Sequence, residues 1–330
     1  MLNNSITDVP GIEVGQAQDL QALTGVSVIL CRKGAVAGVD QRGGAPGTRE
    51  TDLLNPINLI EKVHAIVLAG GSAFGLDSAG GVMKYLEEQN IGFDVGVARV
   101  PIVPAAILFD LSLGRADIRP TSEMGYRAAA DASSVRPVEG NAGAGAGASV
   151  GKIFGNIGAM KSGIGTASID IGGGIIVGAI AAVNAYGDVI DPKTGEIIAG
   201  ARTSKLGLLT IGAPGYFADT LGTMKTLAGR MIEGFAMHSN TVIGVVATNA
   251  HLSKSEATKM AQMAHDGLAR VIRPAHTMLD GDTIFALATG QKNADISLVG
   301  AFAAEAFAAA CISAVMAASS AGGLPGLAGE

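Results

Sequence analysis

The sequence predicts a layered α/β or α+β fold, and three observations support this prediction. Hydrophobic residues make up 48% of the 330 residues and charged residues only 16%, which indicates a dense globular core. Short apolar runs typical of buried strands alternate with longer segments that have helical periodicity. The alternation lacks the strict strand, helix, strand order of a parallel sheet, and no repeat period is evident.

In the first half of the chain, the pattern predicts three strands and two helices. The runs VSVILC and AVAGVD indicate two short strands, and HAIVLAG indicates a longer buried one. Apolar spacing predicts helices over about 73–89 and 122–134, and the two prolines of the intervening segment VARVPIVPAAILFDLSLG favour a strand edge or a loop there. The Gly/Ala-rich segment 140–152 is short and lies between ordered elements, so we interpret it as a tight functional loop at least as readily as a linker.

The second half is predicted to hold further strands and two long helices. Two strands follow the Gly/Ala-rich segment, and the second of them ends at Asn184. A surface excursion of unusual length covers about 191–237 and leads into a buried strand that begins at Thr241. A serine-capped helix that starts in the segment LSKSE, a strand TIFALAT and an Ala-rich closing helix complete the chain. Glu305 near the middle of the closing helix favours a packed helix over a membrane span.

Composition and charge argue against several classes of partner. The formal net charge is −6 and the basic residues are scattered singly, so the chain lacks the basic stripe that a nucleic acid requires. Cys31 and Cys311 lie far apart in apolar surroundings, which predicts reduced core thiols rather than a disulfide or a zinc site. The first residues lack the basic and apolar regions of a signal peptide, which predicts a cytoplasmic protein without a membrane partner.

The spacing in the Gly/Ala-rich segment does not support phosphate binding. A P-loop needs Gly where Ala146 stands and Ser or Thr where Ile153 stands, and a dinucleotide motif needs Gly in place of Val150. Taken alone, Lys152 in this segment is best interpreted as a surface lysine that closes a turn.

Two polar sites could carry chemistry. Asp280 and Asp282 flank a glycine directly before a strand, so both carboxylates can face one small site. They could bind a divalent metal ion with Asp266 as a further ligand, orient and charge a nitrogen base, or form a solvated turn. Asn184 at the end of an apolar strand could donate to a developing oxyanion or cap a turn.

Thr241 is either an ordinary strand-end threonine or a nucleophile held on a rigid element. His238 lies close to it in the sequence, and His276 lies near the acid pair. The other histidines are predicted to be strand-end or helix-surface residues: His64, His251 and His265. A Ser-His-Asp triad can be drawn from the sequence but is disfavoured.

Six separated stretches together resemble one family. They are SITDVPGIEVGQA, LAGGSAFGLDSAGGV, GNAGAGAGASVGK, the strand that ends in Asn184, SNTVIGVVATNAHLSKSE and DGDTIFALATG. In this order, over nearly the whole chain, they resemble the DmpA-type self-processing L-aminopeptidase/D-esterases, a family that includes the β-aminopeptidases and the endo-acting nylon-oligomer hydrolase. The Asn-Thr junction and the Asp-Gly-Asp segment are most similar to the 6-aminohexanoate-oligomer branch, whereas the peptidase members tend to have Gly-Ser at the junction.

The resemblance implies a layered αββα sandwich with two mixed sheets, the N-terminal-nucleophile-hydrolase-like DmpA fold. It implies a single domain, residues 1–330, that cuts itself between Asn240 and Thr241 into an α chain (1–240) and a β chain (241–330). Thr241 would then supply a hydroxyl nucleophile and a free α-amine, whose pKa of about 8 suits a general base. No cofactor is implied, and the family is typically a homotetramer of processed units.

The resemblance also implies roles for the residues that surround the junction. Asn184 matches an oxyanion-hole asparagine, and Asp280 and Asp282 match an acid pair that orients the threonine amine and hydroxyl. Lys152 matches a lysine of the nylon-oligomer branch that keeps the acid pair ionised, which reverses its interpretation as a surface residue. Phe109 stands where relatives carry a tyrosine near the substrate pocket, so a hydroxyl contact to the substrate is missing there.

The expected reaction is hydrolysis of amide bonds in small peptides, amino amides or ω-amino-acid oligomers through a threonine acyl-enzyme. An L-aminopeptidase/D-esterase or β-aminopeptidase specificity is an alternative within the same family. Two hypotheses from other classes stay open: a Mg²⁺-dependent nucleotide or phosphoryl-transfer enzyme that uses Asp280 and Asp282, and a non-catalytic member of the fold.

Overall fold

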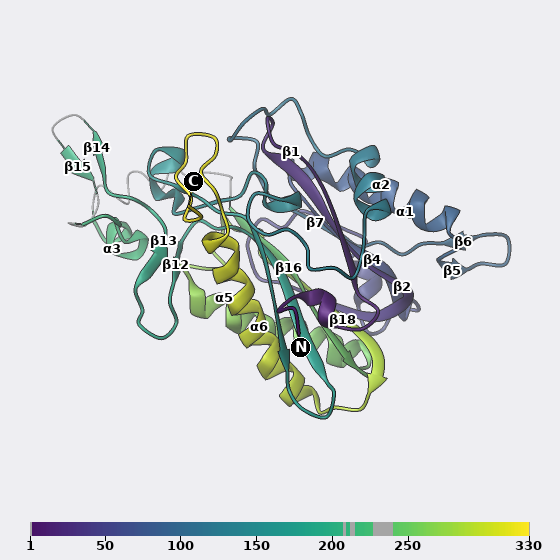
Figure 1. The fold of residues 1–330 in the computed structure, drawn as a ribbon. Helices are drawn as coiled ribbons and strands as arrows, with labels where there is room; N and C mark the ends of the chain where they lie inside the picture. The colour runs from purple at the N-terminus through teal and green to yellow at the C-terminus, as the bar shows by residue number, and fades with distance from the viewer. Residues whose placement is uncertain (1, 207–208, 212–214, 227–239, 330) are drawn as a thin grey trace.

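A nine-stranded mixed sheet forms the centre of the molecule (Figure 1). The computed structural model describes residues 2–206, 209–211, 215–226 and 240–329. The strand order is β10-β11-β16-β18-β2-β4-β7-β3, and β1 pairs with β2 beside this row. These strands are β1 (Glu13–Asp19), β2 (Thr24–Gln41), β3 (Thr48–Arg49), β4 (Lys62–Ala69), β7 (Ala105–Ile107), β10 (Ile164–Asp170), β11 (Ile176–Asn184), β16 (Thr241–Ala250) and β18 (Thr283–Lys292).

β2 joins the two halves of this sheet. Its residues 36–41 pair with β18, and its residues 26–30 pair with β4. Two short strands were predicted here, and that prediction was wrong because both runs belong to one strand of 18 residues. The register shifts between Leu30 and Ala35, where Gly34 has a φ of 77°, a backbone conformation that glycine adopts without strain. A glycine that usually marks a turn here marks an irregularity inside a strand.

Alternating side chains divide the interior into three apolar layers. On β16, Val242 and Val246 face the helices α5 (Lys254–Val271) and α6 (Ile296–Met316), whereas Ile243 and Val245 face the other half of the sheet. That middle layer also contains Ile66 of β4. A third layer packs β2 and β4 against α1 (Ser78–Glu88) and α2 (Ser122–Ala130).

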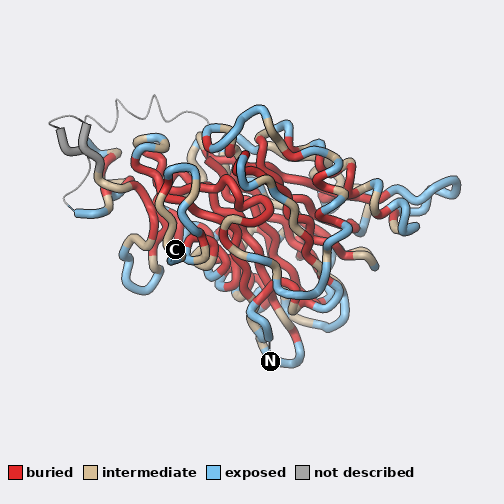
Figure 2. The backbone as a smooth tube through the Cα atoms, turned by 45° about the horizontal axis from the view of Figure 1, so that its top comes forward, coloured by how far each residue is buried: buried red, intermediate tan, exposed pale blue. Residues whose placement is uncertain are grey.

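The order of layers is therefore helices, sheet, sheet, helices, which confirms the predicted αββα sandwich. The two sheets remain hydrogen-bonded to each other through β2. Figure 2 shows the buried segments at the centre and the exposed segments mainly at the periphery.

One predicted helix boundary is confirmed and another is wrong. Ser253 caps α5 and Glu256 returns a hydrogen bond to the cap, which confirms the predicted start. α2 was predicted to reach residue 134 but ends at Ala130, because Ser133 instead exchanges two backbone hydrogen bonds with Val14 of β1. The first predicted helix begins as the 3₁₀ segment η3 (Ser72–Asp77) and continues as α1.

α6 is long and apolar enough to cross a membrane by length and composition alone. In the structure, 61% of its most apolar 18-residue window is buried. Phe307, Cys311 and Val315 belong to the apolar layer between the helices and the sheet. The prediction of a packed helix is confirmed, and both cysteines are free and buried.

Shorter elements surround the sheet. The paired strands are β5 (Phe93–Asp94), β6 (Arg99–Val100), β8 (Ser149–Val150), β9 (Met160–Lys161), β12 (Asp188–Ile190), β13 (Ile197–Ala199), β14 (Ser204–Leu206), β15 (Leu209–Ile211) and β17 (Ile272–Arg273). The short helices are η1 (Ile6–Asp8), η2 (Asp52–Leu54), η4 (Gly143–Gly145), η5 (Lys152–Ile157) and α3 (Thr220–Met224). The predicted excursion 191–237 lies partly outside the described residues, and His238 lies wholly outside them.

Candidate active site

Asn184 and Thr241 lie side by side at one end of the sheet. Asn184 is the last residue of β11 and Thr241 the first residue of β16, and the antiparallel register pairs them directly. Both are buried, with 1% and 4% of their surface exposed. The strand pairing thus places an amide beside a hydroxyl on two rigid elements.

The segment that holds the two aspartates meets the same sheet end from the other side. β18 runs parallel to β16, so the residues just before Thr283 lie beside the start of β16. The backbone N–H of Gly281 donates to the carbonyl oxygen of Asn240 at 3.1 Å. A Cβ on Gly281 would lie 2.7 Å from the carbonyl oxygen of Ala45 and 2.9 Å from the hydroxyl of Thr241. This close approach explains why a glycine separates the two aspartates.

Asp282 is held by two elements. Its Oδ1 accepts from the backbone N–H of Val242 at 2.8 Å, directly beside Thr241. Its Oδ2 accepts from the backbone N–H of His276 at 3.1 Å and lies 2.8 Å from His276 Nδ1. His276 therefore approaches the acid pair as its position predicted, and it fixes the carboxylate against the start of β16.

Asp280 is buried beside Asp282. Its Oδ2 accepts from the backbone N–H and the hydroxyl of Thr277, at 2.8 and 2.6 Å. Burial, together with the charge of Asp282, raises the pKa of Asp280 to about 6, although Thr277 and the charge of Lys152 oppose the rise. One carboxyl of the pair can therefore exchange a proton near neutral pH.

Lys152 is buried at the same site. It is 3% exposed, and its Nζ donates to Oδ1 of Asn184 at 2.6 Å and to the carbonyl oxygen of Asn184 at 3.0 Å. Its backbone N–H donates to the carbonyl of Tyr186, which fixes the start of η5 against the chain that leaves β11. The interpretation as a surface lysine was wrong, because this backbone contact directs the side chain inwards.

Burial lowers the pKa of Lys152 to about 7, although the charges of Asp280 and Asp110 oppose that fall. The lysine therefore changes charge in the same range of pH as Asp280.

The amide of Asn184 is fully oriented. Oδ1 accepts from Lys152 and from the backbone N–H of Ser149 at 3.1 Å, and Nδ2 donates to the carbonyl oxygen of Phe109 at 2.9 Å.

The hydroxyl of Thr241 donates to the carbonyl oxygen of Asn240, the residue that precedes it in one continuous chain. In the described part of the chain, neither Asp280 nor Asp282 forms a hydrogen bond with this hydroxyl. The proposed contact between the acid pair and the threonine amine stays a prediction, because an intact peptide bond leaves no free amine at residue 241.

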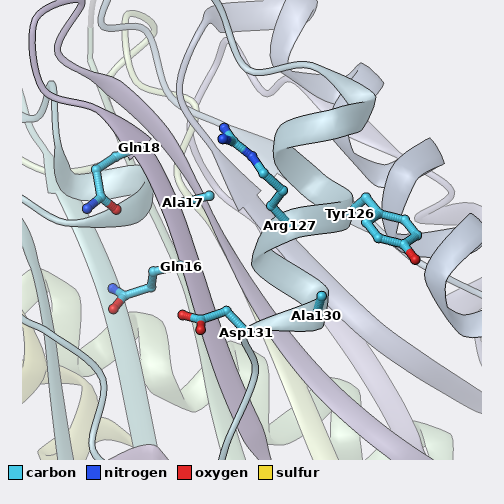
Figure 3. Close-up of a pocket in the computed structure, with 7 residues that line it drawn as sticks. All are labelled: Gln16, Ala17, Gln18, Tyr126, Arg127, Ala130 and Asp131. Atoms are coloured by element: carbon cyan, nitrogen blue, oxygen red, sulfur yellow. The ribbon is translucent and has the colours of Figure 1, made fainter.

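A pocket of about 260 Å³ opens beside Thr241. It is lined by Ala45, Ser72, Ile107, Phe109, Asn240, Thr241 and Leu279. A larger and shallower depression of about 580 Å³ lies between β1 and α2, where Figure 3 shows mostly polar side chains from the two elements. Gln16 in that depression is already hydrogen-bonded to Val138, and Gln18 to Gly143. The smaller pocket, next to a candidate nucleophile, is the better candidate for substrate.

Sequence reasoning missed two buried ionisable residues, Asp110 and Lys161. Asp110 is 3% exposed and accepts from the backbone N–H of Gly71 at 2.7 Å, and Lys161 is fully buried. Neither residue lies in a recognisable spacing, so only their burial could have identified them. His265 was predicted on a helix surface, but it is buried, with its ring 4.8 Å from that of His276.

The geometry gives a metal site no support. Asp266, the additional ligand considered, is exposed on α5. Among the described residues, no group of three or more His, Cys, Asp and Glu side chains could hold a metal ion.

The model of peptidase family S58 matches residues 4–328. The chain belongs to peptidase family S58. It is therefore a hydrolase of peptide or amide bonds, as its resemblance to the DmpA-type enzymes predicted, and the hypothesis of a Mg²⁺-dependent enzyme is not supported.

Curated relatives agree with the S58 assignment. An uncharacterized aminopeptidase of Mycobacterium tuberculosis is 43% identical, with 98% of this chain and 96% of that protein covered. A 6-aminohexanoate-oligomer endohydrolase of Kocuria sp. is 32% identical, with 86% of this chain and 74% of that protein covered.

Solved structures show the same fold at low sequence identity. A Burkholderia sp. β-aminopeptidase has a TM-score of 0.66 and 24% identity, with 98% of this chain and 91% of that chain covered. The L-aminopeptidase D-Ala-esterase/amidase of Ochrobactrum anthropi, described as a variant of the Ntn hydrolase fold, has a TM-score of 0.69 and 19% identity, with 98% and 88% covered. The chain of this S58 protein thus has the fold of the DmpA-type aminopeptidases.

Proposed function

We propose that this S58 protein cuts its own chain before Thr241 and then hydrolyses amide bonds with the new N-terminal threonine. The observation that carries the proposal is the position of the Thr241 hydroxyl against the carbonyl of Asn240, while the N–H of Gly281 contacts the same carbonyl oxygen. A nucleophile and an oxyanion donor therefore meet at one peptide bond.

In the first step, Oγ of Thr241 attacks the carbonyl carbon of Asn240, and the bond from that carbon to the nitrogen of Thr241 breaks. The proton of the hydroxyl passes to the departing nitrogen, which becomes a free amine. Water then hydrolyses the ester and restores the hydroxyl. The products are chains of 240 and 90 residues.

The end of the α chain has a physical reason to leave the site. Nδ2 and Oδ1 of Asn240 are buried, and neither has a hydrogen-bond partner in the described part of the chain. A buried polar group without a partner costs about 1–3 kcal/mol. Cleavage allows this amide to reach water, and it frees the pocket beside Thr241 for a substrate.

In the mature enzyme, the α-amine of Thr241 acts as the base. It accepts the hydroxyl proton while Oγ attacks the substrate carbonyl, and it returns the proton to the leaving amine. Asp280 and Asp282 stabilise the transient ammonium. Gly281 N–H, which contacts the Asn240 carbonyl oxygen, and Asn184 Nδ2 are the proposed oxyanion donors, and Lys152 holds Asn184 in place.

The substrates we propose are small peptides, amino amides and ω-amino-acid oligomers. The walls of the pocket beside Thr241 are mainly apolar, formed by Ile107, Phe109 and Leu279. They suit an aliphatic or aromatic acyl group, in line with the names of the aminopeptidase and oligomer-hydrolase relatives.

A pair of threonine variants on β16 tests the proposal. Thr241→Ala is expected to stay uncut and to lose hydrolysis of every amide, because the nucleophile is gone. Thr248→Ala, on the same strand and equally buried, is the control and should still cut and hydrolyse. A panel of L- and D-amino amides, β-dipeptides and 6-aminohexanoate oligomers measures the activity. Hydrolysis by purified Thr241→Ala at the wild-type rate would refute the proposal.

A further inference from the structure

The Gly/Ala-rich segment 140–152 holds the amide of Asn184. Ser149 and Lys152 both donate to Oδ1, so the shape of this segment sets the direction of Nδ2. We propose that Lys161 is a positioning residue for the oxyanion donor: its ammonium fixes the segment in the shape that brings Ser149 and Lys152 to Asn184. The inference rests on the proposed function, in which Asn184 contacts the oxyanion.

Lys161 gathers three backbone carbonyls around one buried charge. Its Nζ donates to Gly145 at 3.1 Å, to Ala148 at 3.0 Å and to Ser162. Two of these carbonyls belong to the Gly/Ala-rich segment. Strand pairing reinforces the link, because Lys161 on β9 lies directly opposite Ser149 on β8. A change in Lys161 therefore acts on the residue that donates to Asn184.

Burial of this ammonium is costly, which argues that it does more than fill space. The side chain is fully buried, and burial lowers its pKa to about 7. An apolar side chain of similar size would avoid that desolvation, but it would leave the three carbonyls without their charged donor.

Asp110 connects Lys161 electrostatically to the site. Its negative charge favours the protonated forms of both Lys161 and Lys152. The positive charge of Lys152 in turn favours the ionised form of Asp280. The side chain of Asp110 lies close to Gly147, because a Cβ added at Gly147 would be 2.6 Å from the Cβ of Asp110. Buried charges of alternating sign thus lead from Lys161 through Asp110 and Lys152 to the acid pair.

Lys254 offers a matched control for a role in folding alone. It is 4% exposed, and its Nζ donates to the carbonyls of Leu53 at 3.1 Å and Asn58 at 2.8 Å. It follows β16 at the end opposite Thr241. Lys161 and Lys254 therefore make similar bonds to backbone carbonyls, but only Lys161 lies at the Gly/Ala-rich segment.

The first experiment compares Lys161→Met with Lys254→Met. For each, kcat and KM on an amino amide are measured per cleaved chain, with the active sites counted as new N-terminal threonine so that unfolded protein does not contribute. Lys161→Met should lower kcat by roughly 10- to 100-fold and leave KM within about threefold, because misplaced donors weaken transition-state binding. Lys254→Met should keep kcat within about twofold, as expected of a lysine with a role in folding only.

A second variant covers the case in which Lys161→Met does not fold or cut. Asp110→Asn keeps the shape of the side chain but removes the charge that favours the protonated forms of both Lys161, the positioning residue, and Lys152. The other charges that act on Lys152 are Asp280, which favours the protonated form, and Lys161, which disfavours it. The alkaline limb of kcat against pH should move down by about one pH unit.

The results separate this inference from the proposed function. If Thr241→Ala retains activity, the proposed function fails and the role of Lys161 fails with it. If Thr241→Ala is inactive and cut Lys161→Met keeps the wild-type kcat, only the inference is overturned. Where Lys161→Met yields no cut protein, an unchanged pH profile for Asp110→Asn overturns it.

Discussion

At the scale of single residues, the site depends on charges held where water cannot reach them. Lys152 loses most of its hydration and gains two hydrogen bonds to Asn184. Burial lowers its pKa to about 7 because desolvation outweighs the nearby carboxylates. The lysine therefore holds Asn184 through two hydrogen bonds, but the burial of its charge reduces the stability of the fold. Such a compromise between stability and function is common at active sites.

This compromise has a pH dependence whose sign can be worked out. Between pH 7 and the value of about 10.4 for a lysine in the unfolded chain, the unfolded state binds more protons than the folded state. The contribution of Lys152 to stability therefore improves as the pH rises through this range. Relative to that of Lys152→Met, the free energy of unfolding of the protein with lysine should rise by on the order of 3 kcal/mol between pH 7 and 10.

Urea denaturation measures this difference, with both proteins in a Thr241→Ala background so that neither is cut. A difference in unfolding free energy that does not change between pH 7 and 10 would contradict the buried, charge-shifted state of Lys152.

The sequence predicted some of these residues and not others. Asn184 and Thr241 are polar residues at the ends of apolar strands, and Asp280 and Asp282 have a spacing that places them together. Asp110 and Lys161 carry no such signal, because their roles depend on packing between distant segments. The resemblance to the DmpA-type family supplied the roles, which the spacing alone left open.

At the scale of elements, close packing between α1 and α2 gives a sharp test of the fold. Gly81 on α1 meets α2 so closely that a Cβ would lie 1.7 Å from the carbonyl oxygen of Ser122. At the neighbouring Gly80, a Cβ would meet only the Ser122 hydroxyl, at 3.6 Å. The packing therefore excludes a side chain at Gly81 and leaves room for one at Gly80.

Gly81→Ala should lower the free energy of unfolding by about 1–3 kcal/mol, because the two helices must move apart. Gly80→Ala should raise it by about 0.5–1 kcal/mol, because alanine favours the helix and the site has room. Thermal or urea unfolding of both variants measures the contrast. Equal effects of the two substitutions would show that α1 and α2 do not pack as described.

Elements with a clear pattern were predicted well. β16 and β18 are apolar runs, and α5 carries its own caps, so local sequence determines them. The sequence predicts two strands in place of β2 because Gly34 resembles a turn. It predicts a longer α2 because Val14, the strand residue that pairs with Ser133 beyond the helix end, lies far away in the sequence. Tertiary contacts decided both outcomes.

At the scale of the whole molecule, composition could predict layers of helix and sheet but not their order. The αββα order depends on β2 passing from one half of the sheet to the other, a long-range arrangement that no local pattern encodes. The resemblance supplied this order. It also places the proposed cut at the start of a central strand, where a break leaves the sheet intact.

The chains produced by cleavage should therefore stay together. β16 pairs with β11 from Thr241 to Thr248, and β18 pairs with residues 36–41 of β2, so two strands of the 241–330 chain are hydrogen-bonded to strands of the 1–240 chain. Native mass spectrometry of the cut protein should detect chains 1–240 and 241–330 in one complex, separated only by denaturant. Dissociation in native buffer would contradict this account of the sheet.

The central claim is that activity belongs to the N-terminal amine and hydroxyl of Thr241. The most direct measurement follows freshly purified protein over time, by intact mass, N-terminal sequencing and amide hydrolysis in the same samples. We predict fragments of 240 and 90 residues, threonine as the new first residue, and hydrolysis that rises in proportion to the cut fraction. Full hydrolytic activity in a chain that remains whole would contradict the claim.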